Sequence, residues 1–155
     1  MFITKNKSMA QSPFVESNIC MESWDYIRDA TMDWENDEFE AALFLNGIEA
    51  EAKGFSRQML IQKIQWAEGG VEHFRAADVH FGEGSIFADG CVVYHIRAGV
   101  RTPIFRFTWR VQSTNKGKFI VQWSNRGIFR QDRGSNLVFI GKDDAGVRTI
   151  EEEKP

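Results

Sequence analysis

The sequence of 155 residues contains only two cysteines, three prolines and two tyrosines. It has no apolar run near the roughly 18 residues that cross a bilayer, and no apolar export segment follows Met1. Cys20 and Cys91 lie far apart in apolar surroundings, which predicts buried free thiols and no disulfide. We therefore expect a soluble cytoplasmic protein that makes no membrane contact and needs no cross-link for stability.

Motifs that hold metals, phosphates or nucleotide cofactors are also missing. None of the three histidines has the spacing of metal ligands. Gly82-Glu83-Gly84 lacks the third glycine of a dinucleotide-binding turn. His95 alternates with Val93 and Arg97, which predicts that its ring lies on the outer, polar face of a strand. We expect no cofactor and no metal.

The length and the net charge of −3 are typical of one globular domain. Residues 1–18 are polar and aperiodic and predict a loose N-terminal arm, so that residues 19–155 form the single domain. Apolar spacing predicts a helix over residues 19–34, a second over 39–44 and a third that begins near Ser56. A strand is expected over residues 48–53.

From residue 71 onward the apolar period changes to two, which is typical of strands. Strands are expected near residues 71–81, 91–98, 104–113, 118–126 and 137–141, with a final edge strand near 147–151. Turn residues separate them at 89–90, 115–117 and 143–146. Helices followed by antiparallel strands predict an α+β fold, with a curved sheet of about five to six strands around three N-terminal helices.

The aromatic content is high, with thirteen Phe, five Trp and two Tyr. Strand alternation places several rings on one sheet face, opposite a polar and basic face. The residues assigned to the ring face are Val92, Tyr94, Ile96, Phe105, Phe107, Trp109, Val111, Phe119, Val121 and Trp123.

Three segments resemble the nuclear transport factor 2-like superfamily, whose members include ketosteroid-isomerase-like domains. They are Asp33-Trp34-Glu35-Asn36-Asp37-Glu38-Phe39-Glu40-Ala41-Ala42-Leu43, the Asp89-Gly90 turn with the strand Cys91-Val92-Val93-Tyr94, and the strand Lys118-Phe119-Ile120-Val121-Gln122-Trp123-Ser124. The resemblance covers about residues 20–130. It implies a cone-shaped sheet around three helices, an apolar pocket inside the cone and homodimers formed through the outer sheet face.

The rings and the resemblance together predict that the domain binds a small hydrophobic molecule in an aromatic-lined pocket. The expected pocket residues are Tyr26, Glu51, Tyr94, Phe107, Trp109 and Trp123. The first alternative is an isomerase, dehydratase or cyclase in which the resemblance would make Glu51 the base and Tyr26 the proton donor. Against it, Glu51 alternates with Glu49 and Lys53 as a solvated strand face would.

Charge is unevenly distributed along the chain. Residues 22–52 hold ten acidic side chains and one basic one, whereas residues 95–133 hold nine basic side chains and one acidic one. The outer-face arginines predict a homodimer interface, and they are Arg97, Arg106, Arg110 and Arg126. Nucleic acid is not the expected partner, because the rings and the arginines lie on opposite faces. The second alternative function is a homodimeric interaction module without a ligand.

Overall fold

A computed structural model describes residues 5–8, 11–29, 32–49, 54–132 and 137–153. The described helical elements are the short 3-10 helix η1 (Met21–Ser23) and the helix α1 (Trp24–Asp29). All other elements are strands. They are β1 (Lys5–Ser8), β2 (Ser12–Pro13), β3 (Glu16–Ile19), β4 (Glu38–Phe44), β5 (Gln58–Met59), β6 (Ile64–Glu68), β7 (Val71–Arg75), β8 (Val79–Arg97), β9 (Val100–Gln122), β10 (Phe129–Asp132), β11 (Leu137–Ile140) and β12 (Gly146–Glu153).

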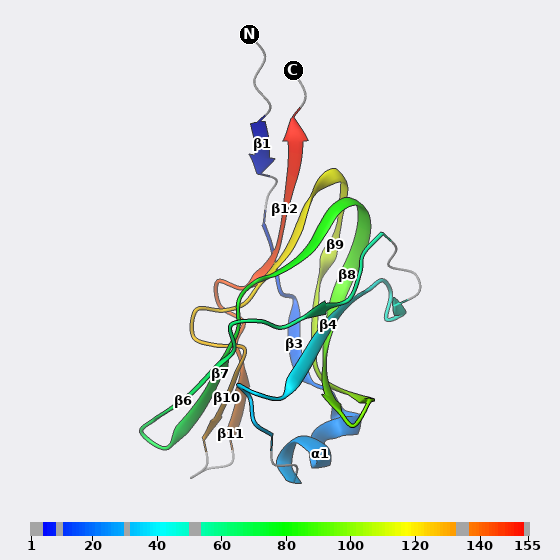
Figure 1. Cartoon of the computed structure of the whole chain (residues 1–155). Helices are drawn as coiled ribbons and strands as arrows, with labels where there is room; N and C mark the ends of the chain where they lie inside the picture. The colour runs from blue at the N-terminus through cyan, green and yellow to red at the C-terminus, as the bar shows by residue number, and fades with distance from the viewer. Residues whose placement is uncertain (1–4, 9–10, 30–31, 50–53, 133–136, 154–155) are drawn as a thin grey trace.

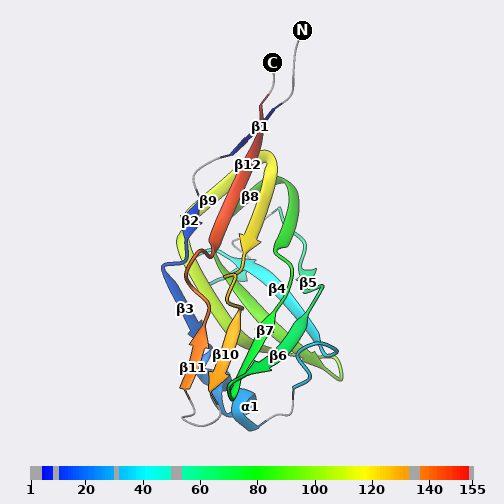
Figure 2. The ribbon, with the colours of Figure 1, turned by 90° about the vertical axis from the view of Figure 1, so that its left-hand side faces the viewer.

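The described strands form two antiparallel sheets (Figures 1 and 2). The eight-stranded sheet has the order β1-β12-β9-β8-β4-β5, with β2 paired to β12 and β3 paired to β9. The four-stranded sheet has the order β11-β10-β7-β6. The long hairpin of β8 and β9 arches over at the end where β12 carries the chain toward its C-terminus (Figure 1).

One two-stranded ribbon links the two sheets. The β8–β9 ladder ends where Val79 pairs with Val121, and the β7–β10 ladder begins where Phe74 pairs with Phe129. Between these two pairs, the chain passes from β7 in one sheet to β8 in the other, and it returns from β9 to β10. The ribbon therefore bends at this point and contributes strands to both sheets, whose facing side chains form the core.

Two groups of rings fill this core. The first, named the Trp34 cluster, consists of Trp34, Phe39, Phe74, Phe105 and Phe129, with ring centroids 5.0–5.9 Å apart in the contacting pairs. The second, named the Phe14 cluster, consists of Phe14, Phe107, Trp109, Phe119 and Trp123, with contacting centroids 4.9–6.5 Å apart. Each of these ten rings is at most 7% exposed.

The predicted α+β class is wrong, because two of the three expected helices are not helical. Residues 39–44 belong to β4, which pairs along its whole length with β8. A short apolar run fits a helix or a buried strand equally well. Here the run is a strand, because it forms a seven-residue ladder with β8. The helix expected after Ser56 is replaced by β5 and the start of β6. Of the three apolar residues expected on its buried side, Leu60 is buried, but Met59 and Ile64 are 41% and 43% exposed.

Two expected turns are also wrong, because residues 89–90 and 115–117 lie inside β8 and β9. The glycine at 117 serves a close approach between strands. A Cβ there would lie 1.9 Å from the carbonyl oxygen of Ile150 on β12. The turn between β8 and β9 is instead made by Ala98 and Gly99, with φ of 51° and 76°. Positive φ at both positions is typical of a two-residue hairpin turn.

The ends of the chain also differ from expectation. The first 18 residues, expected to be a loose arm, contribute β1, β2 and most of β3. β12, expected at an edge, lies between β9 and β1. With strands at both ends of the sequence and little helix, the fold does not support a nuclear transport factor 2-like α+β cone. The buried free thiols are confirmed for Cys20 and Cys91.

In the described part of the chain, no helix is long and apolar enough to span a membrane.

Candidate functional site

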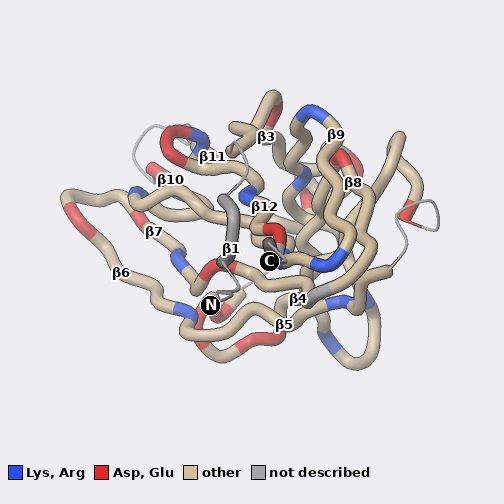
Figure 3. The backbone as a smooth tube through the Cα atoms, turned by 90° about the horizontal axis from the view of Figure 1, so that it is seen from above, with Lys and Arg blue, Asp and Glu red and all other residues tan. Residues whose placement is uncertain are grey.

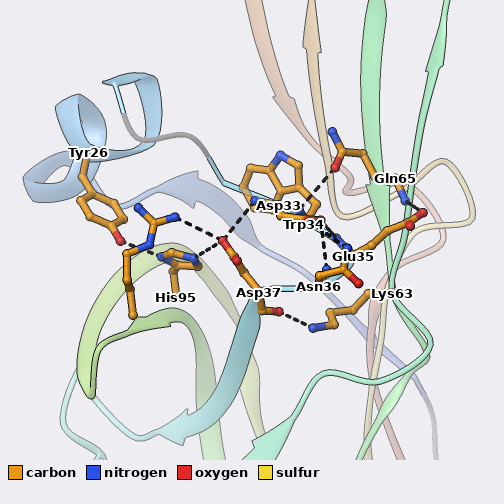
Figure 4. A network of polar contacts seen from close by, with 10 residues as sticks. Tyr26, Asp33, Trp34, Glu35, Asn36, Asp37, Lys63, Gln65 and His95 are labelled. Carbon is orange, nitrogen blue, oxygen red and sulfur yellow. Dashed lines mark hydrogen bonds and ion pairs between the residues drawn. The ribbon is translucent and has the colours of Figure 1, made fainter.

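A buried histidine connects a helix, a loop and a strand (Figure 4). The hydroxyl of Tyr26 on α1 lies 2.7 Å from Nδ1 of His95 on β8. Nε2 of the same ring lies 2.9 Å from Oδ2 of Asp37, just before β4. We name these three residues the Tyr–His–Asp network. His95 has no exposed surface, so both of its ring nitrogens are used inside the protein.

A tight turn before β4 sets the position of Asp37. The carboxylate of Asp33 accepts hydrogen bonds from the backbone N–H groups of Glu35 and Asn36. The backbone N–H of Asp33 in turn donates to Oδ2 of Asp37 at 3.0 Å. Lys63 donates to the backbone carbonyl of Asp37. The turn holds the carboxylate beside His95 before the strand begins.

Asp37 is held in its charged form. Burial raises the pKa of this carboxyl group, but hydrogen bonds from His95, the Asp33 amide and Arg97 lower it, and the net pKa lies below its usual value. A carboxylate only accepts hydrogen bonds, so Nε2 of His95 must carry the proton between them. In the neutral ring Nδ1 is then an acceptor, and the Tyr26 hydroxyl donates to it.

The outer-face prediction for His95 is wrong. Cys91, Val93 and His95 are buried on one face of this part of β8, whereas Val92, Tyr94 and Ile96 lie on the other face, where Val92 is buried and the other two are half-buried. Both alternate sets are mostly apolar, so alternation alone did not decide between them. The partners of His95 lie 58 and 69 residues away in sequence, and no local spacing reveals them. The sequence around His95 therefore has no signal that places its ring in the core.

Three of the expected pocket residues lie together in the Phe14 cluster. The ring centroids of Phe107 and Trp123 are 5.1 Å apart. The ring of Trp109 contacts Phe14, which contacts the other two rings. Phe14, which the sequence placed in a loose arm, contacts all three of these rings at 4.9–6.5 Å. The N–H groups of both indoles donate to backbone carbonyls, those of Ala88 and Ala77. The space beside these rings is occupied by Phe14.

The other expected pocket residues lie elsewhere. Tyr26 belongs to the Tyr–His–Asp network. Tyr94 is cross-strand to Glu40 and lies under the guanidinium of Arg101, 4.0 Å from its ring centroid. Burial and the nearby charge of Glu49 raise the pKa of Tyr94. Glu51 lies outside the described residues.

An open groove of about 750 Å³ borders the Phe14 cluster. Its residues come from the chain around β2, the middle of β9 and the end of β12, and are Gln11, Ser12, Pro13, Phe14, Val15, Arg110, Val111, Gln112, Ser113, Thr149 and Glu151. We name it the Phe14 groove. Val15 and Val111 are 54% and 47% exposed there.

Val111 departs from the ring face that strand alternation predicted for it. The β8–β9 ladder is irregular between Ala88 and Gly90, opposite this part of β9. Phe107 is buried before the irregularity, Val111 is exposed within it, and Thr114 is buried after it. The irregularity changes which alternate positions face the core, and it turns Val111 toward the groove.

The four arginines expected at a dimer interface have different surroundings. Arg97 and Arg106 form ion pairs within the chain, with Asp37 at 3.3 Å and Glu22 at 3.4 Å. Arg110 lines the Phe14 groove, and Arg126 is exposed in the segment after β9. Basic and acidic positions are spread over the described chain (Figure 3). The homodimer stays a prediction.

Within the described ranges, no group of three or more His, Cys, Asp or Glu residues is arranged to hold a metal ion. Comparison with known proteins found no matching family model, no matching curated protein and no matching solved structure. The candidate sites therefore rest on the chain's own geometry.

Proposed function

We propose that this domain binds a small amphipathic molecule, an apolar body with an acidic group, in the Phe14 groove. The observation that carries the proposal is the groove itself, because its volume of about 750 Å³ falls in the range of small-ligand sites. The expected binding of a small hydrophobic molecule is kept, but the ligand lies outside Phe14 and not among the rings behind it.

The apolar contribution comes from two valines that water now covers. Val15 and Val111 are each about half exposed at the groove. Removing apolar surface from water stabilises a complex by roughly 25 cal/mol per Å² before the costs of association. Pro13 and Phe14 extend the apolar lining between them. A ligand with an apolar body gains most by lying across both valines.

The acidic group is favoured by the charges of the groove. Glu151 already accepts hydrogen bonds from the backbone N–H groups of Asn115 and Lys116. The guanidinium of Arg110, on the same lining, has no carboxylate within ion-pair distance among the described residues. A ligand carboxylate or sulfonate would provide that partner and would accept two parallel hydrogen bonds.

The test uses 1-anilinonaphthalene-8-sulfonate, which joins aromatic rings to a sulfonate, titrated into the folded protein. Arg110→Gln is expected to weaken binding about tenfold, since a charge-assisted hydrogen bond contributes about 1.5 kcal/mol or more. Val111→Asp is expected to weaken probe binding further, because the substitution removes apolar surface and places a negative charge near the sulfonate.

Arg126→Gln is the matched control, since it removes the same charge from an exposed site that does not line the groove. The proposal is wrong if the wild type does not bind the probe. It is also wrong if Arg110→Gln and Val111→Asp bind it as tightly as Arg126→Gln. Urea unfolding of each variant checks that it is folded, so that weaker probe binding cannot come from loss of the fold.

A further inference from the structure

The Tyr–His–Asp network joins a hydroxyl, an imidazole and a carboxylate in the same order as sites in which a side-chain hydroxyl acts as a nucleophile. A hydroxyl lies at hydrogen-bond distance from one nitrogen of an imidazole, and a carboxylate orients the other nitrogen. In such an arrangement the imidazole removes the hydroxyl proton as the oxygen attacks, and the carboxylate stabilises the imidazolium that forms. Here the hydroxyl is that of Tyr26.

The three side chains differ in their access to solvent. His95 is fully buried and reaches no outside molecule directly. The side chain of Asp37 is 27% exposed, but its Oδ2 contacts His95, Arg97 and the Asp33 amide. Tyr26 is half-buried at the end of the network. It is therefore the group through which the network can react with a small molecule.

We propose that Tyr26 is a nucleophilic tyrosine that accepts acyl groups from activated esters, with His95 as its general base and Asp37 as a positioning residue. The Tyr26 oxygen forms a bond to the carbonyl carbon of the ester, and its proton passes to Nδ1 of His95. The carbon–oxygen bond to the leaving group breaks, and the leaving group departs as an alkoxide or phenolate with that electron pair. The product is an acyl ester of Tyr26.

The chain provides its own control, because its second tyrosine lacks this arrangement. Tyr94 is also half-buried, but its ring lies under Arg101 and its pKa is raised by burial and by Glu49. A raised pKa keeps the hydroxyl protonated and less nucleophilic. Both side chains can be compared in one sample of the wild-type protein.

The experiment treats the folded protein with p-nitrophenyl acetate and measures acetylation of each tyrosine by peptide mass spectrometry. Tyr26 is expected to be acetylated about 100-fold faster than Tyr94, the lower end of what a positioned base contributes. His95→Gln should remove most of that difference, and Tyr26→Phe should abolish the Tyr26 adduct while leaving the slow Tyr94 adduct unchanged.

Asp37→Asn tests the positioning role. It should lower Tyr26 acetylation about tenfold or more and leave the Tyr94 rate unchanged. The ¹⁵N shifts of His95 should show the proton on Nε2 in the wild type and a mixture of tautomers in the variant. An unchanged Tyr26 acetylation rate in a folded Asp37→Asn variant would overturn the positioning role.

The wild-type comparison remains decisive even if a variant fails to fold. Equal rates at Tyr26 and Tyr94, or a faster rate at Tyr94, would overturn the proposal. So would an unchanged Tyr26 rate in a folded His95→Gln variant. This test does not involve the Phe14 groove, so its result and that of ligand binding are independent.

Discussion

The two ring clusters are built from similar side chains but are held in different ways. In the Trp34 cluster, Phe39 and Phe105 come from the long ladders that β4 and β9 form with β8, and Phe74 and Phe129 face each other in the shorter β7–β10 ladder. Trp34 itself lies in the turn before β4. In the Phe14 cluster, the central ring stands between β2 and β3, strands of two and four residues. Equal burial need not mean equal resistance to opening, since a ring on a short segment can leave without unfolding the sheet.

The largest effect is expected in the Trp34 cluster. Phe105→Ala should lower the free energy of unfolding by about 3–5 kcal/mol, because the ring is fully buried between Trp34 and Phe129 and leaves a cavity. Urea unfolding measures the change. Phe87→Ala removes a ring that is 49% exposed and should cost well under 1 kcal/mol. Equal losses for both variants would contradict this assignment of the core.

A smaller effect is expected for Phe14→Ala, about 3 kcal/mol, at the lower end of the range for a buried ring. The ring is 3% exposed, but its segment can detach and leave the β8–β9 ladder intact. Hydrogen exchange should become faster at β3 and at its partner residues 105–108 on β9, and remain unchanged in β4. If Phe14→Ala costs as much as Phe105→Ala and exchange rises everywhere, the two clusters form one cooperative unit and the comparison fails.

The Trp34 cluster also adjoins a carboxylate whose charge stabilises the fold. The folded-state pKa of Asp37 is lowered, so its contribution is present above the unfolded value of about 3.9 and is lost as pH falls through the lower folded value. The wild type should lose stability over this acid range more steeply than Asp37→Asn. Asp143→Asn, at an exposed turn, is the control and should follow the wild type. Parallel curves for Asp37→Asn and the wild type would contradict the shift.

The smallest perturbation uses the two thiols as reporters of opening. Burial raises the pKa of Cys20 to about 11 and raises that of Cys91 further, so both should react with iodoacetamide far more slowly in the folded than in the unfolded protein. Cys20 follows β3 and is bonded to Ile104 through its backbone N–H. It should therefore label before Cys91.

Phe14→Ala sharpens this test. It should accelerate labelling of Cys20 and leave that of Cys91 unchanged, because Cys91 lies in the central ladder between β4 and β9. Equal acceleration at both thiols would show that the N-terminal segment does not open separately.

Several features could be predicted from the sequence because they depend on local alternation. The burial of Phe105, Phe107 and Trp109 against the exposure of Arg106 and Arg110 follows directly from the period of two in β9. The strands near residues 137–141 and 147–151 and the turn between them are confirmed, since turn residues mark them. Part of the first helix is also confirmed as α1.

Other features were decided by contacts between distant segments. β4 is a strand because β8 offers it a seven-residue ladder, an advantage that residues 39–44 cannot encode by themselves. His95 is buried because Tyr26 and Asp37, from two other segments, satisfy both of its nitrogens. Neither partner is visible in the sequence around it.

The sequence has few cysteines and no long apolar run, but it has many aromatic rings. These features alone indicate that burial of aromatic side chains stabilises this protein. Tertiary structure alone decided how the rings are used. Phe14 crosses from the N-terminal segment to fill the space beside Phe107, Trp109 and Trp123, and an irregular ladder turns Val111 outward to the groove. The physical reason is that burial is a local preference of a side chain, whereas its partner is set by which distant segments the sheet brings together.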